Sequence, residues 1–341
     1  MRFLCLPGAY GSAKNFGVQL GPFAKHMEDR GLATFVFTEG AHEVEPPLGW
    51  ENYFGSRPLY RFVEAVGGTG DAFEVVRRVR HIPRGLSPEA TLRLFKPPRP
   101  VDFDWSTFRR ALDRIFETIE ADPEIDGLIG YSEGAMMAAS ICAEENRRWE
   151  EKGIPRRIKF AIFFAGTPPL VSEGDGFTAR LADEHGTSIS IPTFHVFGSN
   201  DPLVYSSVAL YNACDQDSAQ LYDHGLGHLV PRDADNVEQL GDVLADVITR
   251  INKDTEKETE KEGEKEKEKV VVDATAAAAA AKGETESVSA SDTEPPSADE
   301  YSAMGPSSAA SSDESSSDLD SRSSSGVGVG VGVGSEGVDR V

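Results

Sequence analysis

The chain has 341 residues, a formal net charge of −23 and three widely spaced cysteines. Aromatic and large aliphatic residues are concentrated in residues 1–252, a length compatible with one large α/β domain. The acidic charge argues against a nucleic-acid or anionic-membrane binder, and the cysteine pattern argues against a disulfide framework or a zinc site.

The N-terminal segment is predicted to form a strand, a loop and a helix. Arg2 to Leu6 is a short apolar run, residues 7–12 form a glycine-bearing loop, and a helical pattern continues to about Arg30. A second strand is expected from Ala33 to Thr38, which is rich in β-forming residues. Short strands that alternate with helices predict the α/β class, with a doubly wound, mostly parallel sheet covered by helices on both faces.

An irregular stretch rich in proline follows, from Gly40 to about Val101. It contains five clustered aromatic residues: Trp50, Tyr53, Phe54, Tyr60 and Phe62. Long irregular segments in compact domains are often lids or binding loops. These rings are therefore expected either to line an apolar ligand site or to form a satellite core under a long loop, and the sequence favours neither.

The next elements lead to a Gly-x-Ser-x-Gly motif. An amphipathic helix is predicted from Trp105 to about Glu120, capped by Asp104 or Ser106, and an apolar strand from Ile125 follows it. The motif places Ser132 between two glycines, before a run of small and apolar residues. This pattern predicts a nucleophile elbow, in which the serine lies on a strained turn and the flanking backbones approach too closely for side chains.

Two later strands end in loops with residues suited to catalysis. Strands are expected at Lys159–Ala165, Pro192–Phe197 and Ala219–Tyr222. Asp201 follows the second of these, where an acid partner of a catalytic imidazole would stand, although aspartates in such turns commonly act only as caps.

A histidine in the loop after the last strand is the expected general base. His228 follows a glycine and precedes a helix that begins near Asp233, and His224, closer to the strand, is the alternative. The order Ser132, Asp201, His228 is that of α/β-hydrolases. The backbone N–H groups of Glu133 and Ala9 are the expected oxyanion donors.

Several segments together resemble the fungal serine hydrolase (FSH) family of α/β-hydrolases. The segments are Leu4–Gly8 with Phe16, Phe37–Glu43, Gly130–Gly134, Phe160–Phe163, Pro192–Gly198 with Asp201–Pro202, and Gly227–Pro231. The resemblance covers about residues 1–250 and implies Ser132, Asp201 and His228 as the triad. The chain departs from the family at Pro7 and Tyr10, where members often have His-Gly-x-Gly.

The family resembles small carboxylesterases and the human ovarian-cancer-associated hydrolase, and it includes thioesterase-like enzymes of fungal polyketide gene clusters. The resemblance therefore implies a serine hydrolase that cleaves a small-molecule acyl ester or thioester, with a polyketide synthase acyl carrier as a candidate partner. An acyltransferase with the same triad, or a non-catalytic binding protein on a hydrolase scaffold, are the alternatives. No cofactor, metal, nucleic acid or membrane is expected to take part.

Composition changes abruptly after Asn252. Residues 253–341 contain a Glu/Lys-rich stretch, an alanine run, a Ser/Asp/Glu-rich stretch and a Gly-Val repeat. Such a sequence cannot bury enough apolar surface to offset the loss of chain entropy, so it is predicted to be a disordered acidic tail. Pro7 and Gly8 interrupt the N-terminal apolar run, and no uncharged apolar run reaches about 18 residues, which predicts a soluble cytoplasmic protein.

Overall fold

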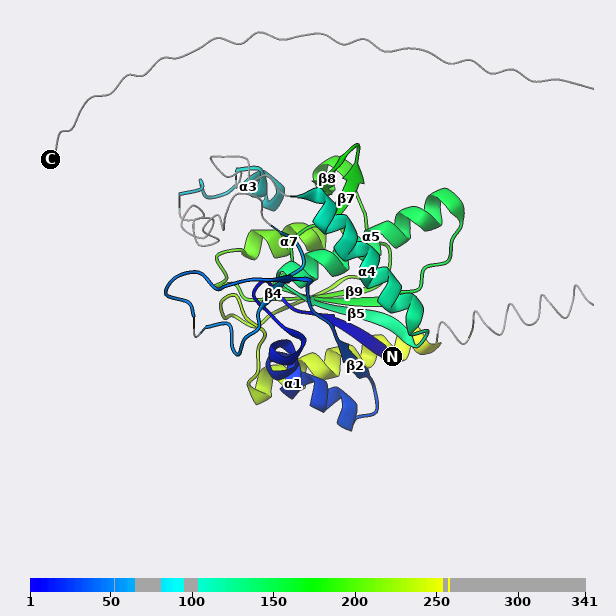
Figure 1. Cartoon of the computed structure of the whole chain (residues 1–341). Coiled ribbons are helices and arrows are strands. Elements are labelled where there is room, and N and C mark those ends of the chain that lie inside the picture. Colours follow the sequence, from blue (N-terminus) through cyan, green and yellow to red (C-terminus); the bar gives the residue numbers. More distant parts are fainter. Residues whose placement is uncertain (52, 65–80, 95–103, 254–256, 258–341) are drawn as a thin grey trace, which may run out of the picture. The chain divides into compact units, whose positions relative to one another are not determined.

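The computed structural model describes residues 1–51, 53–64, 81–94, 104–253 and 257 (Figure 1). Apart from Lys253 and Lys257, the predicted acidic tail lies outside these described residues. Within the described part of the chain, every helix is too short or too polar to cross a bilayer.

A six-stranded parallel sheet runs through the centre of the fold, in the order β10-β9-β6-β5-β1-β2. The strands are β1 (Arg2–Leu6), β2 (Thr34–Phe37), β5 (Ile125–Tyr131), β6 (Phe160–Phe164), β9 (Thr193–Phe197) and β10 (Gln220–Asp223). Every residue of β6 and β9 is buried, as expected for central strands covered on both faces.

The strand order changes direction between β1 and β5. The chain moves outward from β1 to β2, returns to β5 on the other side of β1, and then continues outward to β10. In a doubly wound sheet, ligands bind outside the carboxyl ends of the strands at such a switch point. Ser132, which follows β5 directly, lies at this position.

One face of the sheet is covered by α1 (Ala13–Asp29) and a C-terminal helix over residues 234–253, below the sheet in Figure 1. Ser12 caps α1 by accepting a hydrogen bond from the backbone N–H of Asn15. Apolar side chains of both helices pack against the strands in one cluster, which includes Phe16, Leu20, Phe23, Met27, Leu240, Leu244 and Ile248.

The opposite face is covered by α4 (Trp105–Ala121), α5 (Glu133–Lys152) and α7 (Val204–Asn212). Asp104 caps α4, because its side chain accepts a hydrogen bond from the backbone N–H of Ser106. A second cluster joins these helices to the sheet and includes Leu4, Leu6, Phe108, Leu128, Ile141, Phe163 and Leu210. Helices on both faces of a parallel sheet confirm the predicted fold class.

The remaining elements are small and project from the sheet's connections. They are β3 (His42–Glu43) paired with β4 (Tyr60–Arg61), α3 (Pro88–Leu94), the hairpin of β7 (Leu170–Glu173) and β8 (Gly176–Ala179), and α6 (Ala182–His185). The sequence analysis did not predict them. The predicted strands of the main sheet are all present, with bounds that differ by no more than two residues at either end.

Candidate active site

Ser132 occupies a sharp turn between β5 and α5. Its backbone has φ 53° and ψ −113°, a strained conformation for a residue with a side chain, and its N–H donates to the carbonyl of Phe164 at 2.9 Å. The turn therefore anchors the serine to the neighbouring strand β6, as a nucleophile elbow requires.

The two glycines of the motif are required by close backbone contacts. A Cβ atom on Gly134 would lie 2.2 Å from the carbonyl oxygen of Leu6, and one on Gly130 would lie 2.4 Å from the Cα of Ala135. Neither site has room for a side chain without displacing backbone. This is the steric condition that the sequence analysis inferred from the motif.

The structure brings Ser132, His228 and Asp201 into one hydrogen-bonded chain. Nε2 of His228 lies 3.0 Å from Oγ of Ser132, and Nδ1 of His228 lies 2.7 Å from Oδ2 of Asp201. Because an ionised carboxylate only accepts hydrogen bonds, this geometry favours the imidazole tautomer with its proton on Nδ1. Nε2 is then free to accept from the serine hydroxyl.

The carboxylate of Asp201 is buried and held by the backbone. The residue is only 2% exposed, and its Oδ1 accepts a hydrogen bond from the N–H of Leu203 at 2.8 Å. The side chain of His228 is 28% exposed. The acid is therefore shielded from water while the imidazole remains accessible to a ligand.

The loops after β9 and β10 are tied to each other. The amide of Asn200 donates to the carbonyl of Gly225 at 2.6 Å, and the carboxylate of Asp223 accepts from the N–H groups of Ser199 and Gly225, each at 2.8 Å. These contacts hold the segment with Asp201 against the segment with His228.

His224 makes different contacts from His228. Its Nδ1 accepts from the N–H of Leu226 at 3.2 Å, and its Nε2 is buried and has no hydrogen-bond partner among the described residues. Burial lowers the pKa of His224 below its ordinary value, although Asp223 and Asp201 act in the opposite direction. Of the two histidines considered in the sequence, His228 is the one hydrogen-bonded to Ser132.

The loop after β1 passes directly over the elbow. A Cβ atom on Gly8 would lie 3.2 Å from the Cβ of Ser132, and a turn closes where the N–H of Gly11 donates to the carbonyl of Gly8 at 3.0 Å. Within the described ranges, neither the N–H of Ala9 nor that of Glu133, the first residue of α5, donates a hydrogen bond. Both expected oxyanion donors therefore keep a free N–H.

Backbone strain is concentrated at this edge of the sheet. Among the described residues, three non-glycine residues have a positive φ: Tyr10 at 61°, Ser132 at 53° and Ala165 at 47°. They follow the neighbouring strands β1, β5 and β6 at their carboxyl ends. Strained backbone conformations of this kind cluster at functional sites, where the surrounding structure enforces them.

Two side chains at the elbow form contacts that the sequence analysis missed. The hydroxyl of Tyr131 donates to the backbone carbonyl of His228 at 2.9 Å, so the residue before the serine holds the histidine loop. The carboxylate of Glu133 accepts from Arg61 Nε at 2.8 Å and from the N–H of Phe62 at 2.7 Å. Local sequence patterns gave no signal for either contact, because both partners lie far away in the chain.

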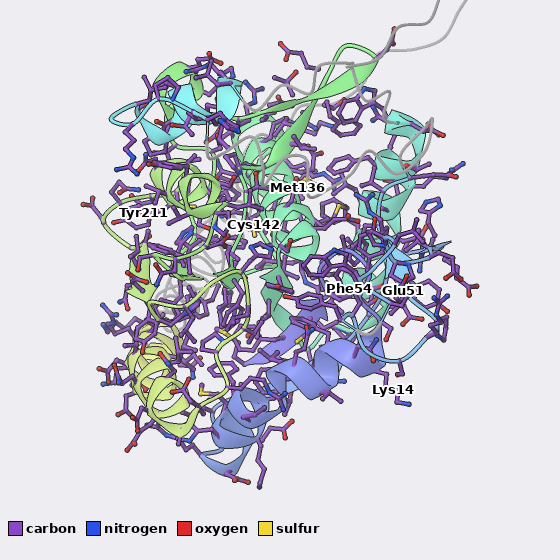
Figure 2. All side chains as sticks on the ribbon, turned by 90° about the vertical axis from the view of Figure 1, so that its left-hand side faces the viewer. Lys14, Glu51, Phe54, Met136, Cys142 and Tyr211 are labelled. Atoms are coloured by element: carbon purple, nitrogen blue, oxygen red, sulfur yellow. The ribbon has the colours of Figure 1, made fainter. Side chains whose placement is uncertain are left out.

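The aromatic residues between 50 and 62 divide into two groups. Phe62 is 3% exposed and packs in the core with Leu4 and Phe108, which corresponds to the packing alternative for this residue. Trp50, Tyr53 and Phe54 pack on one another, and Phe54 lies 4.8 Å from the ring of Tyr10 in the loop over the elbow. Figure 2 shows Phe54 and Glu51 close together, near the start of α1 at Lys14.

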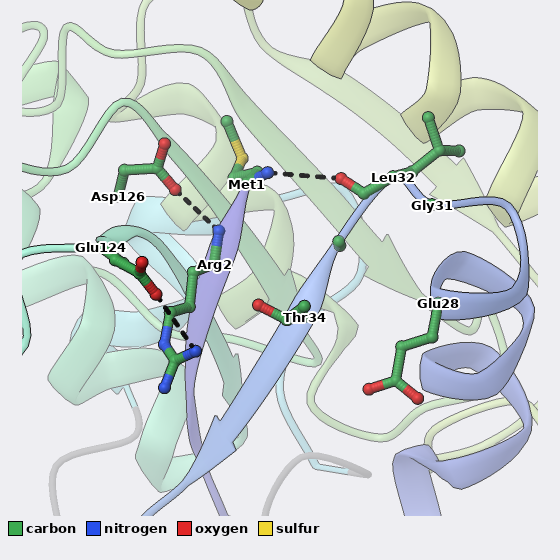
Figure 3. A pocket seen from close by; sticks show the side chains of 9 residues that line it. Met1, Arg2, Glu28, Gly31, Leu32, Thr34, Glu124 and Asp126 are labelled. Atoms are coloured by element: carbon green, nitrogen blue, oxygen red, sulfur yellow. Dashed lines mark hydrogen bonds and ion pairs between the residues drawn. The ribbon is translucent and has the colours of Figure 1, made fainter.

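A surface depression of about 550 Å³ lies at the opposite edge of the sheet, where β1, β2 and β5 begin (Figure 3). Its polar lining includes Arg2, Glu124 and Asp126. The Arg2 side chain forms an ion pair with Glu124, and the backbone N–H of Arg2 donates a hydrogen bond to the carboxylate of Asp126. It holds none of the predicted site residues. No group of three or more His, Cys, Asp or Glu side chains in the described ranges is arranged to hold a metal ion.

Comparisons with known proteins agree on one family. The family model described as serine hydrolase (FSH1) matches residues 1–240. The chain is 34% identical to esterase FPY3 of Fusarium mangiferae over 73% of this chain and 98% of the relative. It is 28% identical to human esterase OVCA2 over 68% of this chain and 89% of the relative, and 27% identical to hydrolase phiM of Talaromyces stipitatus over 68% and 82%, respectively.

Proposed function

The chain belongs to the serine hydrolase (FSH1) family, and from this premise we propose that it cleaves acyl esters through Ser132, His228 and Asp201. The observation that carries the proposal is the continuous hydrogen-bonded chain from the buried carboxylate of Asp201 to the hydroxyl on the strained elbow. The names of the relatives, two of which are esterases, support an ester as the substrate class.

Ser132, His228 and Asp201 have different roles in the proposed reaction. His228 Nε2 accepts the proton of Ser132 Oγ as this oxygen attacks the acyl carbon, and the same proton then moves to the departing alcohol or thiol. Asp201 holds the imidazole in the required tautomer and stabilises its cationic form. His228 then takes a proton from water as the water oxygen attacks the acyl-enzyme, and it passes this proton to Ser132 Oγ as the bond to the acyl group breaks, which releases the acid and restores the serine hydroxyl.

The oxyanion of the tetrahedral intermediate is bound by two backbone N–H groups. We assign these to Glu133, which begins α5, and to Ala9 in the loop over the elbow. Donors that are already free and oriented need no reorganisation when the charge develops, and the loss of one such donor costs about 10²- to 10³-fold in rate.

The side chains around the site favour an apolar acyl group. Tyr10 lies in the loop over Ser132 and packs on Phe54, and Leu226 and Leu229 on either side of His228 are 42% and 38% exposed. Tyr53 in turn packs on Phe54, with the two ring centres 5.1 Å apart. An ester or thioester with a long acyl chain, including one carried by a polyketide synthase acyl carrier, fits such walls.

Labelling with a serine-directed fluorophosphonate tests the nucleophile. We expect the mapped label on Ser132, and we expect Ser132→Ala to lose both the label and the turnover of a simple ester. Ser140, on the same helix but hydrogen-bonded to the carbonyl of Met136, provides the matched control Ser140→Ala, which should be labelled normally. Modification at another residue, or equal labelling of the Ser132→Ala variant, would refute the assignment.

A ladder of substrates tests the acyl group and the acceptor. Each additional buried methylene should contribute about 0.8 kcal/mol, nearly fourfold in kcat/KM, until the pocket is full. The ladder consists of p-nitrophenyl esters and matched acyl thioesters from two carbons upward, and added alcohol or amine reveals acyl transfer as a new product. A flat or falling series would show that the aromatic residues are not part of the acyl site.

A further inference from the structure

The residue after the nucleophile is tied to a distant segment through its side chain. Glu133 begins α5, and its carboxylate is 7% exposed. One oxygen accepts from Arg61 Nε at 2.8 Å, and the other accepts from the N–H groups of Phe62 at 2.7 Å and Val63 at 3.3 Å. A side chain with both oxygens engaged restrains its own backbone, and this backbone carries one of the two oxyanion donors assigned above.

The same distant segment also holds the second donor loop. The N–H of Tyr60 donates to the carbonyl of Gly11 at 3.0 Å, and the guanidinium carbon of Arg61 lies 5.9 Å from the centre of the Tyr10 ring. Tyr10 and Gly11 follow Ala9 directly. Strand β4 (Tyr60–Arg61) is therefore attached to both halves of the oxyanion site, to one half by the Glu133 carboxylate and to the other by the loop after β1.

The charges of the pair matter for the reaction. A carboxylate one residue from the serine opposes the negative charge of an oxyanion unless a cation lies beside it. Burial alone would lower the pKa of Arg61, but the charge of Glu133 and the hydrogen bond between them raise it above its ordinary value. The pair is therefore neutral as a whole, and the dipole of α5 faces the oxyanion without an opposing charge.

We propose that Glu133 and Arg61 form a positioning pair that sets the distance between the two oxyanion donors, a role that rests on the proposed hydrolase function. The pair does not touch the reacting atoms. It holds β4 against the start of α5, and β4 in turn holds the loop with Ala9 over Ser132. Its removal is therefore expected to impair the stabilisation of the transition state more than the binding of the substrate.

The test compares Glu133→Gln with the wild-type chain on a p-nitrophenyl ester. The amide retains the volume and one carbonyl acceptor but loses the ion pair with Arg61. We expect kcat to fall about 10- to 10²-fold with KM within about threefold, because a donor is misplaced instead of removed. A trifluoromethyl ketone, which forms a tetrahedral adduct with serine, should bind more weakly by the same factor, whereas the corresponding alcohol should keep its affinity.

The control is Glu144→Gln on the same helix. Glu144 also pairs with two arginines, Arg147 and Arg148, but far along α5 from the elbow, so its variant should keep the wild-type kcat and inhibitor affinities. Arg61→Met should reproduce the loss in Glu133→Gln, and the double variant should lose no more than either single one, since both break the same pair. If Glu133→Gln does not fold, Arg61→Met alone takes its place with the same expected result, since it breaks the same pair.

The outcomes separate this inference from the function on which it rests. A wild-type chain that neither hydrolyses esters nor reacts with a fluorophosphonate overturns the proposed function, and the positioning role with it. The positioning role alone is overturned if the wild type is active and the Glu133→Gln variant keeps kcat within twofold, or if the only change in this variant is a higher KM.

Discussion

Two histidines four residues apart, His224 and His228, differ in the partners of their ring nitrogens. His228 is hydrogen-bonded on both sides, to Asp201 and to Ser132, whereas His224 accepts from a backbone N–H and has a buried Nε2 without a hydrogen-bond partner among the described residues. A general base must be within hydrogen-bond reach of the proton that it takes. Only His228 meets this condition in the structure.

We predict that His228→Ala lowers kcat for a p-nitrophenyl ester by at least about 10³-fold, because the serine loses the group that accepts its proton. His224→Ala serves as the matched control and should change kcat/KM by less than about tenfold. Steady-state kinetics with both variants provide the measurement. An inactive His224→Ala beside an active His228→Ala would exchange the two roles.

A third histidine, His195, is buried in strand β9 and is expected to make the stability of the fold depend on pH. It is 1% exposed on strand β9, its Nε2 lies 3.0 Å from Oγ1 of Thr193, and burial lowers its pKa to about 3. In the unfolded chain a histidine has a pKa of about 6.5. As the pH falls below 6.5, the unfolded chain therefore binds a proton that the folded chain does not, and the free energy of unfolding decreases.

We predict a loss of up to about 1.4 kcal/mol in the free energy of unfolding for each pH unit below about 6.5 from this residue alone. His195→Gln should lower stability at pH 7 through lost packing against Phe163 and Tyr211, but it should flatten the pH dependence between pH 6.5 and 5. Urea unfolding at several pH values measures both effects. The exposed His81 provides the control His81→Gln, and an unchanged slope in His195→Gln would contradict the prediction.

At the scale of elements, the junction of β1, β5 and α5 depends on the absence of a side chain at Gly134. A Cβ atom there would lie 2.2 Å from the carbonyl oxygen of Leu6 and 2.4 Å from that of Pro7, so α5 or the loop after β1 would have to move. The helix thus packs on the strand end that leads into the loop with Ala9. Packing and the proposed catalytic geometry depend on the same contact.

We predict that Gly134→Ala lowers the free energy of unfolding by about 2 kcal/mol and reduces ester turnover, because the added methyl group overlaps backbone atoms. Gly17→Ala in α1 is the matched control, since its Cβ atom would lie 4.0 Å from Phe37 and the alanine favours the helix by about 1 kcal/mol. Denaturant unfolding of both variants measures the change in the free energy of unfolding that each substitution causes. Equal effects would mean that the backbone at Gly134 can adjust.

The elements that the sequence predicted share strong local signals. Strand β6 is a continuous apolar run, β9 has three apolar residues among its five buried ones, and α4 has an apolar stripe behind an aspartate cap. Helix α7 was missed because its burial does not follow hydrophobicity: Ser207 is buried while Val208 is only partly so. The β7–β8 hairpin was missed although Gly174, with φ 57°, marks its turn, because three of its eight residues are polar or charged and exposed.

The same difference between strong and weak local signals explains which parts of the candidate site could be predicted from the sequence. The proximity of Ser132, Asp201 and His228 could be predicted because each follows a strong strand within a few residues, and parallel strands bring their carboxyl ends to one edge. The contacts of the Glu133 carboxylate could not be predicted in this way, because its partners lie about 70 residues earlier, in a stretch without regular periodicity. Local patterns predict elements and the residues next to them, whereas side-chain contacts between distant segments need the tertiary structure.

At the scale of the whole molecule, charge and core have different distributions along the chain. Residues 253–341 contain 9 basic and 21 acidic residues, so they carry −12 of the net charge of −23. Within the part of the chain that the structure describes, the buried core ends earlier. Val247 and Ile248 are the last buried apolar residues of the helix over 234–253, and Asn252 and Lys253 are exposed.

We predict that a chain ending at Asn252 keeps the melting temperature within about 1 °C and the ester turnover of the full chain. Among the described residues, every side chain that packs on the sheet is retained in it, including the partly buried Ile251. A chain ending at Glu238 is the contrasting case and should not fold. It lacks Leu240, Leu244, Val247 and Ile248 and therefore exposes the face of the sheet that they cover.

Calorimetry and ester hydrolysis provide the measurements. Both are made at two salt concentrations, since removal of 12 net negative charges should also weaken the dependence of stability on salt. A loss of several degrees in the chain ending at Asn252 would mean that residues after 252 contribute to the stability of the domain, and the predicted boundary would have to move.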